Sequence, residues 1–453
     1  MTNKKSTIVL FSILLGLVIF SCSNEAFDVI KDTDEIADTA NTNEETIDTP
    51  NSTSSSPNIL FIIADDLGKD AINGFTEGSI KPNTPNIDAI RTDGISFQNF
   101  WTNPTCTPTR ASILTGKYGY RTNVKGAGDI LAQSEISLQQ YISENTNDAY
   151  SSAVVGKWHL AGNDSNVNPE DFGIDYYAGL IRGAVDDYYR WQLTEDGTSS
   201  LQTEYTTEVF TDLAINWVNE QSKPWFLWLA YNAPHAPFHI PPSNMHSQGN
   251  LPEYSDNLDP LPYYMAAIEA MDFQIGRFLD AIPLEEKENL VIIFIGDNGT
   301  PNQVAQSPYS SNKVKNTLYQ GGVNVPMFVS GSSVSRIGTD HNLITSTDLF
   351  ATIAEITGIP TREIHDSKSF KGLLTIDTPT REFQYSEMNN GLTDEWTASN
   401  GVYKFIIDSS GDEQLYNLMG DSYEENNLLN GTLSSTEQDA KTLLEAELSA
   451  IRD

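Results

Sequence analysis

Four continuous apolar runs constrain the fold of this chain more than any other feature. Each run has the length of a β-strand and ends in a polar cluster: residues 58–66 (NILFIIADD), 151–159 (SSAVVGKWH), 223–235 (KPWFLWLAYNAPH) and 289–299 (NLVIIFIGDNG). Hydrophobicity that does not alternate is typical of strands buried on both faces. Helical patterns over residues 206–221 and 265–282 lie between these runs. The sequence therefore predicts an α/β fold with a mostly parallel central sheet flanked by helices.

The segments on either side of this predicted sheet have a different composition. After residue 374, short strand-like stretches such as EFQYSEM and EWTASNGVYKFIID precede a helix that begins near Ser435. We interpret this part as a smaller antiparallel subdomain. Residues 23–57 are acidic, rich in Ser and Thr and nearly free of aromatic residues, a composition that cannot bury a core. We therefore predict a flexible tether at 22–57, the main domain at 58–374 and the subdomain at 375–453.

The N-terminus has the features of an export signal. Lys4 and Lys5 precede an apolar stretch from Ile8 to Phe20, which is shorter than a typical membrane-spanning helix. Because Cys22 follows at once, residues 1–21 resemble a bacterial lipoprotein signal, in which this cysteine becomes the lipidated first residue. An ordinary cleaved signal peptide is the alternative. The lipoprotein interpretation predicts a bacterial cell-envelope protein held at the outer membrane, the cell surface or in the periplasm by its lipid anchor alone.

Net charge and cysteine content limit which partners and which site chemistry the protein can have. The net charge is −36, from 62 acidic and 26 basic residues, and this argues against a nucleic-acid partner. The chain has two cysteines. If Cys22 carries lipid, Cys106 has no disulfide partner. A lone exported cysteine is either a reactive thiol or a chemically altered residue.

The polar clusters at the strand ends predict one shared site. Ligands of open parallel sheets bind at the carboxyl ends of the strands. Asp65, Asp66, Asp297 and Asn298 end two of the apolar runs and offer only oxygen donors. Oxygen donors suit Ca²⁺ or Mg²⁺ rather than zinc. A pair of aspartates alone is more often a solvated turn, but two such clusters on two buried strands favour a metal site.

The residues around Cys106 predict the start of a helix. Thr107 is a candidate N-cap, Pro108 is tolerated in the first turn, and helical character continues to Gly116. The helix dipole stabilises an anion at such a terminus, and Arg110 lies one turn further on. A buried structural cysteine is the alternative. Lys157, at the end of a buried run, requires an anionic partner.

Cys106-Thr-Pro-Thr-Arg110 followed by LTG resembles the C-x-P-x-R signature of the type I sulfatases, in the alkaline-phosphatase-like superfamily. The resemblance extends over ADD (64–66), GKWHLAG (156–162), APHAPF (233–238), GDNG (296–299) and KNTLYQGG (315–322), in the family's order. In that family a maturation enzyme, here a predicted partner, oxidises the cysteine to formylglycine. The chain departs from the family at Asn324, where arginine is common, and at Tyr120, where many members have Pro-His. Both departures bear on the identity of the substrate.

The resemblance implies a mechanism and a role for each site residue. One Ca²⁺ ion is held by Asp65, Asp66, Asp297, Asn298 and the matured side chain at 106. One hydroxyl of the hydrated aldehyde attacks sulfur, and the second then expels sulfate. The implied roles are that Arg110 orients the hydrate, Lys157 and Lys315 neutralise the sulfuryl oxygens, His159 is the base in the elimination step, and His235 with Lys315 protonates the leaving oxygen.

The resemblance predicts a sulfatase, and a lipid anchor favours a sulfated poly- or oligosaccharide as its substrate. Residues 182–191 and His239 are candidates for the substrate subsites, although aromatic loop residues are more often packing. His159, His235 and Lys315, each taken alone, are more often structural or solvated than catalytic. Two other functions stay open. One is a phosphonate or phosphate ester hydrolase of the same superfamily, and the other is a lipoprotein that binds sulfated glycan without turnover.

Overall fold

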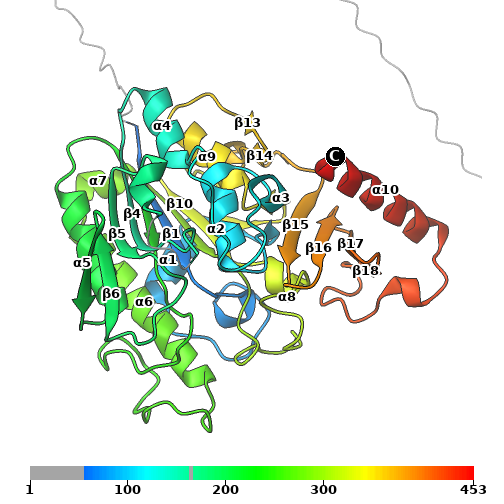
Figure 1. Ribbon diagram of the computed structural model, residues 1–453, viewed down its shortest axis with the longest axis horizontal. Coiled ribbons are helices and arrows are strands. Elements are labelled where there is room, and N and C mark those ends of the chain that lie inside the picture. The colour runs from blue at the N-terminus through cyan, green and yellow to red at the C-terminus, as the bar shows by residue number, and fades with distance from the viewer. Residues whose placement is uncertain (1–55, 163–166) are drawn as a thin grey trace, which may run out of the picture. The chain divides into compact units, whose positions relative to one another are not determined.

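A ten-stranded sheet forms the centre of the computed structural model, which describes residues 56–162 and 167–453 (Figure 1). Its strand order is β11-β2-β10-β9-β1-β8-β4-β5-β6-β7. The strands are β1 (Asn58–Ala64), β2 (Ile95–Phe97), β4 (Ser151–Lys157), β5 (Tyr176–Leu180), β6 (Trp191–Glu195), β7 (Thr198–Gln202), β8 (Trp225–Ala230), β9 (Leu290–Gly296), β10 (Met327–Gly331) and β11 (Gly338–Asp340). The predicted signal, Cys22 and all but the last two residues of the predicted tether lie outside the described residues.

The middle of this sheet is parallel, as the sequence predicts. β9, β1, β8, β4 and β5 are parallel neighbours, and the first four of these strands are the four apolar runs. β10, β6 and β7 pair antiparallel towards the two sides of the sheet. The parallel strands therefore bring the polar ends of all four runs to one edge.

Burial on both faces explains why the runs are continuously apolar. In β1, Ile59, Phe61 and Ile63 belong to one core cluster, while Leu60 and Ile62 belong to the other. Two groups of helices supply the rest of these cores, on opposite sides of the sheet in Figure 1. They are α2 (Cys106–Thr115), α4 (Leu138–Thr146) and α9 (Asp348–Ile356) on one face, and α1 (Pro85–Thr92), α5 (Thr206–Asn219) and α6 (Leu261–Ala281) on the other.

The C-terminal part forms a four-stranded antiparallel sheet and a helix, as predicted. The elements are β15 (Gln384–Asn389), β16 (Asp394–Ser399), β17 (Tyr403–Asp408), β18 (Glu413–Asn417) and α10 (Ser435–Arg452). A capping box between Ser434 and Glu437 begins α10, because each residue's side chain accepts from the other's backbone N–H. Leu444 and Leu448 of α10 then pack into one core cluster with Phe405.

A buried ion pair joins this small sheet to the loop that carries Lys315. Lys404 Nζ lies 2.6 Å from Glu424 Oε1 and also donates to the carbonyl oxygen of Leu318 at 2.5 Å. The backbone N–H of Gln320 donates to the other oxygen of Glu424 at 2.5 Å. Since all these groups are buried, each depends on the others for its hydrogen bonds. The C-terminal sheet thereby fixes the loop from Leu318 to Gln320.

Short elements complete the described chain. They are β3 (Phe100–Trp101), β12 (Ile344–Thr345), β13 (Glu363–Ile364), β14 (Ser367–Lys368), α3 (Gly119–Thr122), α7 (Leu284–Glu288), α8 (Gln320–Val323) and the 3-10 turns η1 (Lys69–Ala71), η2 (Pro169–Phe172), η3 (Lys371–Leu374) and η4 (Leu428–Asn430). Within residues 56–162 and 167–453, no helix combines the length and the apolar character that a membrane span requires.

The close approach of β4 and β5 generates a stability prediction. A Cβ atom on Gly179 would lie 1.8 Å from the carbonyl oxygen of Gly156, so Gly179→Ala must push two paired strands apart. We expect a loss of about 2 kcal/mol or more in the free energy of unfolding, measured by chemical denaturation. Gly420→Ala is the control, because nothing lies within 4 Å of that added Cβ. Equal stability of the two variants would contradict the expectation.

Candidate active site

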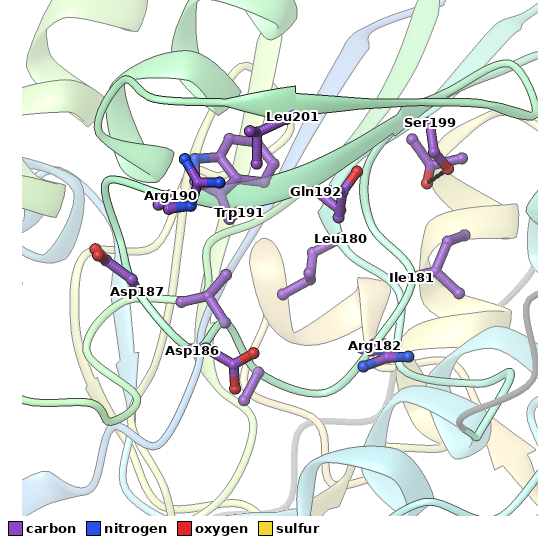
Figure 2. A pocket seen from close by; sticks show the side chains of 13 residues that line it. Leu180, Ile181, Arg182, Asp186, Asp187, Arg190, Trp191, Gln192, Ser199 and Leu201 are labelled. Carbon is purple, nitrogen blue, oxygen red and sulfur yellow. Dashed lines mark hydrogen bonds between the residues drawn. The ribbon is translucent and has the colours of Figure 1, made fainter.

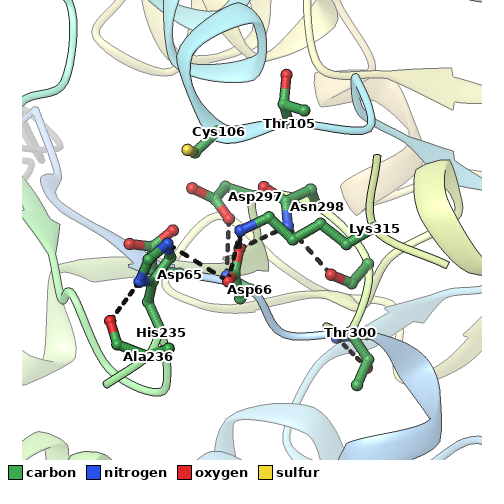
Figure 3. Close-up of polar contacts among 12 residues, drawn as sticks. Asp65, Asp66, Thr105, Cys106, His235, Ala236, Asp297, Asn298, Thr300 and Lys315 are labelled. Carbon is green, nitrogen blue, oxygen red and sulfur yellow. Dashed lines mark hydrogen bonds and ion pairs between the residues drawn. The ribbon is translucent and has the colours of Figure 1, made fainter. Parts of the chain in front are cut away.

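All ten residues predicted for the site meet at the carboxyl edge of the parallel sheet, and seven of them are labelled in Figure 3. They form one connected set of contacts: Asp65 and Asp66 follow β1, Lys157 ends β4 and His159 follows it, His235 follows β8, Asp297 and Asn298 follow β9, Cys106 and Arg110 lie in α2, and Lys315 comes from the loop before α8. Parallel pairing of β9, β1, β8 and β4 is the reason for this convergence.

Cys106 is the first residue of α2, and its side chain points towards the acidic cluster in Figure 3. It is a free, buried cysteine, and its Sγ lies 3.1 Å from Nδ1 of His159. The prediction of Thr107 as the N-cap is wrong: the N-cap is Thr105, which has extended backbone angles and makes no side-chain cap bond. The Thr107 hydroxyl instead accepts from the backbone N–H of Gly128. The helix thus begins at the cysteine itself.

Arg110 connects three strand ends. Its Nε and Nη2 donate to Oδ2 of Asp297 at 3.1 and 2.8 Å, and its Nη1 donates to the carbonyl oxygen of Lys157 at 2.7 Å. Burial raises the pKa of Asp297, and the charge of Asp65 raises it further, against the opposing charges of Arg110 and Lys157. The guanidinium therefore serves both as a counter-charge and as a link between β4 and β9.

The two lysines each pair with one of the adjacent aspartates. Lys157 Nζ donates to Oδ2 of Asp65 at 2.5 Å, which is the anionic partner that the sequence required. Lys315 Nζ lies 2.6 Å from Asp66, and Nε2 of His235 lies 3.6 Å from the same carboxylate. Burial alone would raise the pKa of Asp66, but the charges of Lys315, His235 and Lys157 outweigh it and hold this pKa well below the usual range.

Two oxygens of this cluster fit a bound cation. Oδ1 of Asp65 and Oδ1 of Asn298 are buried and have no hydrogen-bond partner within the described part of the chain. Unpaired buried oxygens are costly unless a cation or water satisfies them. Ligand atoms of Asp65, Asp297 and Cys106 also lie within 4.8 Å of one another. The donor set therefore fits a hard divalent cation, with residue 106 at its boundary.

The two site histidines have different surroundings. Burial lowers the pKa of His159 well below its ordinary value, and the charges of Lys157 and Arg110 lower it further, so this imidazole is neutral. His235 is partly exposed, and its Nδ1 lies 2.6 Å from the carbonyl oxygen of Ala236. A carbonyl can only accept, so Nδ1 carries a proton and Nε2 faces the site.

Two site residues occupy the left-handed backbone region. Asp66 has φ of 69° and His159 has φ of 58°, a conformation that costs non-glycine residues about 1 kcal/mol or more. Contacts compensate in both places: the backbone N–H of Asp66 donates to Oδ1 of Asp297, and that of His159 donates to the carbonyl oxygen of Ile181. These turns direct the two side chains into the site.

The sequence did not identify two residues, Tyr264 and Lys69, that hold the site residues and their neighbours in place. The hydroxyl of Tyr264 in α6 donates to the carbonyl oxygen of Asp66 at 2.6 Å. Lys69 is buried, and its Nζ donates to Oδ1 of Asn324 at 2.7 Å and to the carbonyl oxygen of Gln98. Burial lowers the pKa of Lys69 to about 7. In the sequence, Tyr264 looks like any core residue of an apolar helix. Lys69, which closely follows the first apolar run, could have been recognised as a buried charge.

The two departures from the family pattern have structural partners. Besides Lys69, Asn324 contacts the side chain of Gln320. The hydroxyl of Tyr120 donates to the backbone of Ile451 in α10, and its ring packs against Tyr385. The side chains of Asn324 and Tyr120 thus connect elements of the fold and are not part of the group of ten site residues.

Comparison with solved structures assigns the fold. Ps i-CgsB in complex with k-i-k-neocarrahexaose aligns with a TM-score of 0.74 at 22% identity, covering 88% of this chain and 94% of that one. BT4656 in complex with D-Glucosamine-2-N, 6-O-disulfate aligns with a TM-score of 0.71 at 19% identity, covering 88% and 99%. The chain therefore shares the fold of these two solved structures.

The sequence comparisons then define the family. The model of the family described as Sulfatase matches residues 57–359, and the chain belongs to this family. Mouse Arylsulfatase J is 26% identical over 325 residues, 67% of this chain and 52% of the relative. Human N-acetylgalactosamine-6-sulfatase is 28% identical over 339 residues, 67% and 62%. The chain thus spans about half to three fifths of the length of these two curated relatives.

The buried charge network generates a second stability prediction. Arg110→Met would leave Asp297 and Asp65 without their shared counter-charge in a buried site. We expect a loss of about 3–5 kcal/mol in the free energy of unfolding, measured by denaturant titration without divalent metal. In Arg121→Met, the control, a 44% exposed side chain loses its ion pair with Asp366, and the expected cost is below about 1 kcal/mol. Similar losses in both variants would show that the buried network does not stabilise the fold.

Proposed function

We propose that this protein is a Ca²⁺- and formylglycine-dependent sulfatase that hydrolyses sulfate esters of a sulfated poly- or oligosaccharide. The observation that carries the proposal is the buried cysteine at the start of α2, whose Sγ lies 3.1 Å from Nδ1 of His159 and within 4.8 Å of ligand atoms of Asp65 and Asp297. Family membership supports the reaction class. A human relative is named for N-acetylgalactosamine-6-sulfate chemistry, and a structural neighbour is described with a disulfated glucosamine as its substrate.

Charge balance supports a divalent cation in the working site. The carboxylates of Asp65, Asp66 and Asp297 are matched by Arg110, Lys157 and Lys315, so the site without metal is close to neutral. A bound Ca²⁺ ion would raise its net charge to about +2, which attracts and stabilises a sulfate ester anion. The ligands would be Asp65, Asp66, Asp297, Asn298 and residue 106.

The chemistry would be shared between two supplied groups and the chain's own side chains. Formylglycine at residue 106 supplies the nucleophilic hydroxyl when hydrated, and Ca²⁺ supplies positive charge beside it. Arg110 holds Asp297 in place, while Lys157 and Lys315 offer ammonium groups to the sulfuryl oxygens. A lysine that contacts both a carboxylate and the substrate holds the substrate in position and also balances its negative charge.

Proton transfer would be divided between the two histidines. His159 is neutral and its Nδ1 lies against the side chain of residue 106, so it accepts a proton there. His235 already donates through Nδ1 to Ala236, so it can give a proton from Nε2 only as the imidazolium. The carboxylate of Asp66, 3.6 Å from Nε2, stabilises that cation and prepares His235 to protonate the leaving oxygen.

The modification of Cys106 is the decisive test. When the protein is produced with a formylglycine-generating enzyme, we expect the peptide containing residue 106 to have the mass of formylglycine. Cys106→Ala should abolish hydrolysis of sulfate esters and keep the melting temperature. Full activity of protein with an unmodified thiol would rule out this mechanism. Hydrolysis of phosphate or phosphonate esters alone would point to the other hydrolase class, and glycan binding without turnover would identify a binding lipoprotein.

Metal removal gives a separate test. Exhaustive chelation should abolish activity, and Ca²⁺ should restore it better than Zn²⁺ because the donors are oxygens. We expect Asp297→Ala to lose several kcal/mol of transition-state stabilisation, seen as a drop in kcat/KM of about a thousandfold or more. Asp366→Ala, which removes the partner of Arg121, is the control and should keep activity within about threefold. Activity that persists without metal, with none found by elemental analysis, would refute the site.

We also propose that the protein is anchored in the bacterial cell envelope by lipid on Cys22. The support is the N-terminal sequence, with its basic start, short apolar stretch and immediate cysteine. Mass spectrometry of the mature N-terminus from native membranes would test it. A lipidated Cys22 is the expected result, and an unlipidated N-terminus at any other residue would contradict the proposal.

A further inference from the structure

A cavity of about 620 Å³ opens beside the site, between the end of β5, the loop 181–190 and the β6–β7 hairpin (Figure 2). None of the ten site residues lines it. Its walls combine apolar side chains such as Leu180, Trp191 and Leu201 with charged and neutral polar ones. Because apolar and polar groups alternate around it, the cavity suits a ring with polar substituents rather than a purely apolar ligand.

The loop that lines this cavity also contacts both site histidines. The carbonyl oxygen of Ile181 accepts from the backbone N–H of His159 at 3.1 Å. A Cβ on Gly183 would lie 2.2 Å from Nε2 of His159, so only glycine allows this approach. The hydroxyl of Tyr188 donates to the carbonyl oxygens of Asn232 and His235 at 2.8 and 2.6 Å. The loop that forms part of the cavity wall therefore also contacts both site histidines.

Two arginines of the cavity have no acidic partner among the residues that the structure describes. Seven of the ten arginines in the chain pair with a carboxylate, as expected where acidic residues outnumber basic ones by more than two to one. Arg182 and Arg190 are exposed, line the same cavity and make no ion pair within residues 56–162 and 167–453. Figure 2 shows Arg190 beside Trp191 on one side of the cavity and Arg182 on the other.

The remaining groups suit a sugar. Nε1 of Trp191 donates to the carbonyl oxygen of Glu204 at 3.0 Å, which fixes the indole in the wall. Two acids, Asp186 and Asp187, also line the cavity. Oδ1 of Asp187 accepts from the backbone N–H of Tyr189 at 2.7 Å, so part of its charge is already used. Carboxylates accept hydrogen bonds from sugar hydroxyls, while guanidinium groups form paired hydrogen bonds with sulfate or carboxylate.

We propose that this cavity is a subsite for an acidic sugar unit next to the one whose sulfate is hydrolysed, with Arg182 and Arg190 binding its sulfate or carboxylate group. The proposal rests on the function proposed above and makes it more specific: the substrate is a glycan with acidic groups on neighbouring units. The observation that carries it is that these two arginines make no ion pair with any described residue, although the chain has a net charge of −36.

Binding to Cys106→Ala protein in Ca²⁺ buffer tests the subsite without turnover. The probes are dextran sulfate oligosaccharides, oligogalacturonate as the carboxylate arm, and neutral dextran as the blank. We expect one acidic probe to bind well above neutral dextran. Arg182→Gln and Arg190→Gln should each weaken that binding about fivefold, and the double variant about tenfold or more. The arm that responds identifies sulfate or carboxylate as the bound group.

Arg362→Gln is the matched control. Arg362 is also exposed and without an ion pair in the described chain, but it lies between α9 and β13 and lines no part of the cavity. Its substitution removes the same charge, and we expect binding within about twofold of the parent. Equal effects at all three arginines would show that binding depends only on the total charge of the protein, and this would overturn the subsite. Failure of both acidic probes to bind above neutral dextran would overturn it as well.

Matured enzyme separates this proposal from the proposed function. If it hydrolyses a small aryl sulfate while all the arginine variants bind the acidic probes as tightly as the parent, the subsite is wrong and the sulfatase assignment holds. If the arginine variants lose binding while matured enzyme hydrolyses no sulfate ester, the subsite holds and the proposed reaction is wrong. With both correct, the double variant should lose at least about five times more kcat/KM on a polysulfated oligosaccharide than on the aryl sulfate.

Discussion

Three buried carboxylates at neighbouring strand ends must each be balanced by positive charge. The rest of the site depends on which cations pair with them. Arg110 pairs with Asp297, Lys157 with Asp65, and Lys315 with Asp66. These cations come from α2, β4 and a loop, so the electrostatic requirement of one edge of the sheet fixes three other elements. Losing any one of the partners leaves an uncompensated charge in a buried site.

This arrangement also explains how a strongly acidic protein can attract an anion. Fixed carboxylates and cations nearly cancel locally, so the divalent ion that we propose would shift the local charge to positive even though the whole chain stays negative. The buried His159, whose pKa is lowered by burial, and the partly exposed His235, which faces Asp66, have different surroundings within one small site. Loop 181–190 contacts both histidines and carries two arginines that have no ion pair within the described part of the chain.

Much of the fold was predictable because its physical signals are local. Continuous apolar runs identified β1, β4, β8 and β9, and turn-separated short strands identified the C-terminal sheet. The choice of Thr107 as the N-cap was wrong, because several threonines flank Cys106 and the sequence does not show which one adopts extended backbone angles. Tyr264 went unrecognised because a tyrosine within an apolar helix looks like core until its hydroxyl is seen to bond Asp66.

By itself the sequence determined that the strands are buried on both faces, that their polar ends share one edge, and that oxygen donors gather there. Those properties follow from residue type and order along the chain. Only the tertiary structure decided which cation pairs with which carboxylate and that Arg182 and Arg190 line one cavity. It also decided that, among the described residues, two site oxygens have no hydrogen-bond partner and these two arginines have no acidic partner. The reason is physical: ion pairing and desolvation depend on distances of a few ångströms between residues far apart in sequence, and packing alone sets those distances.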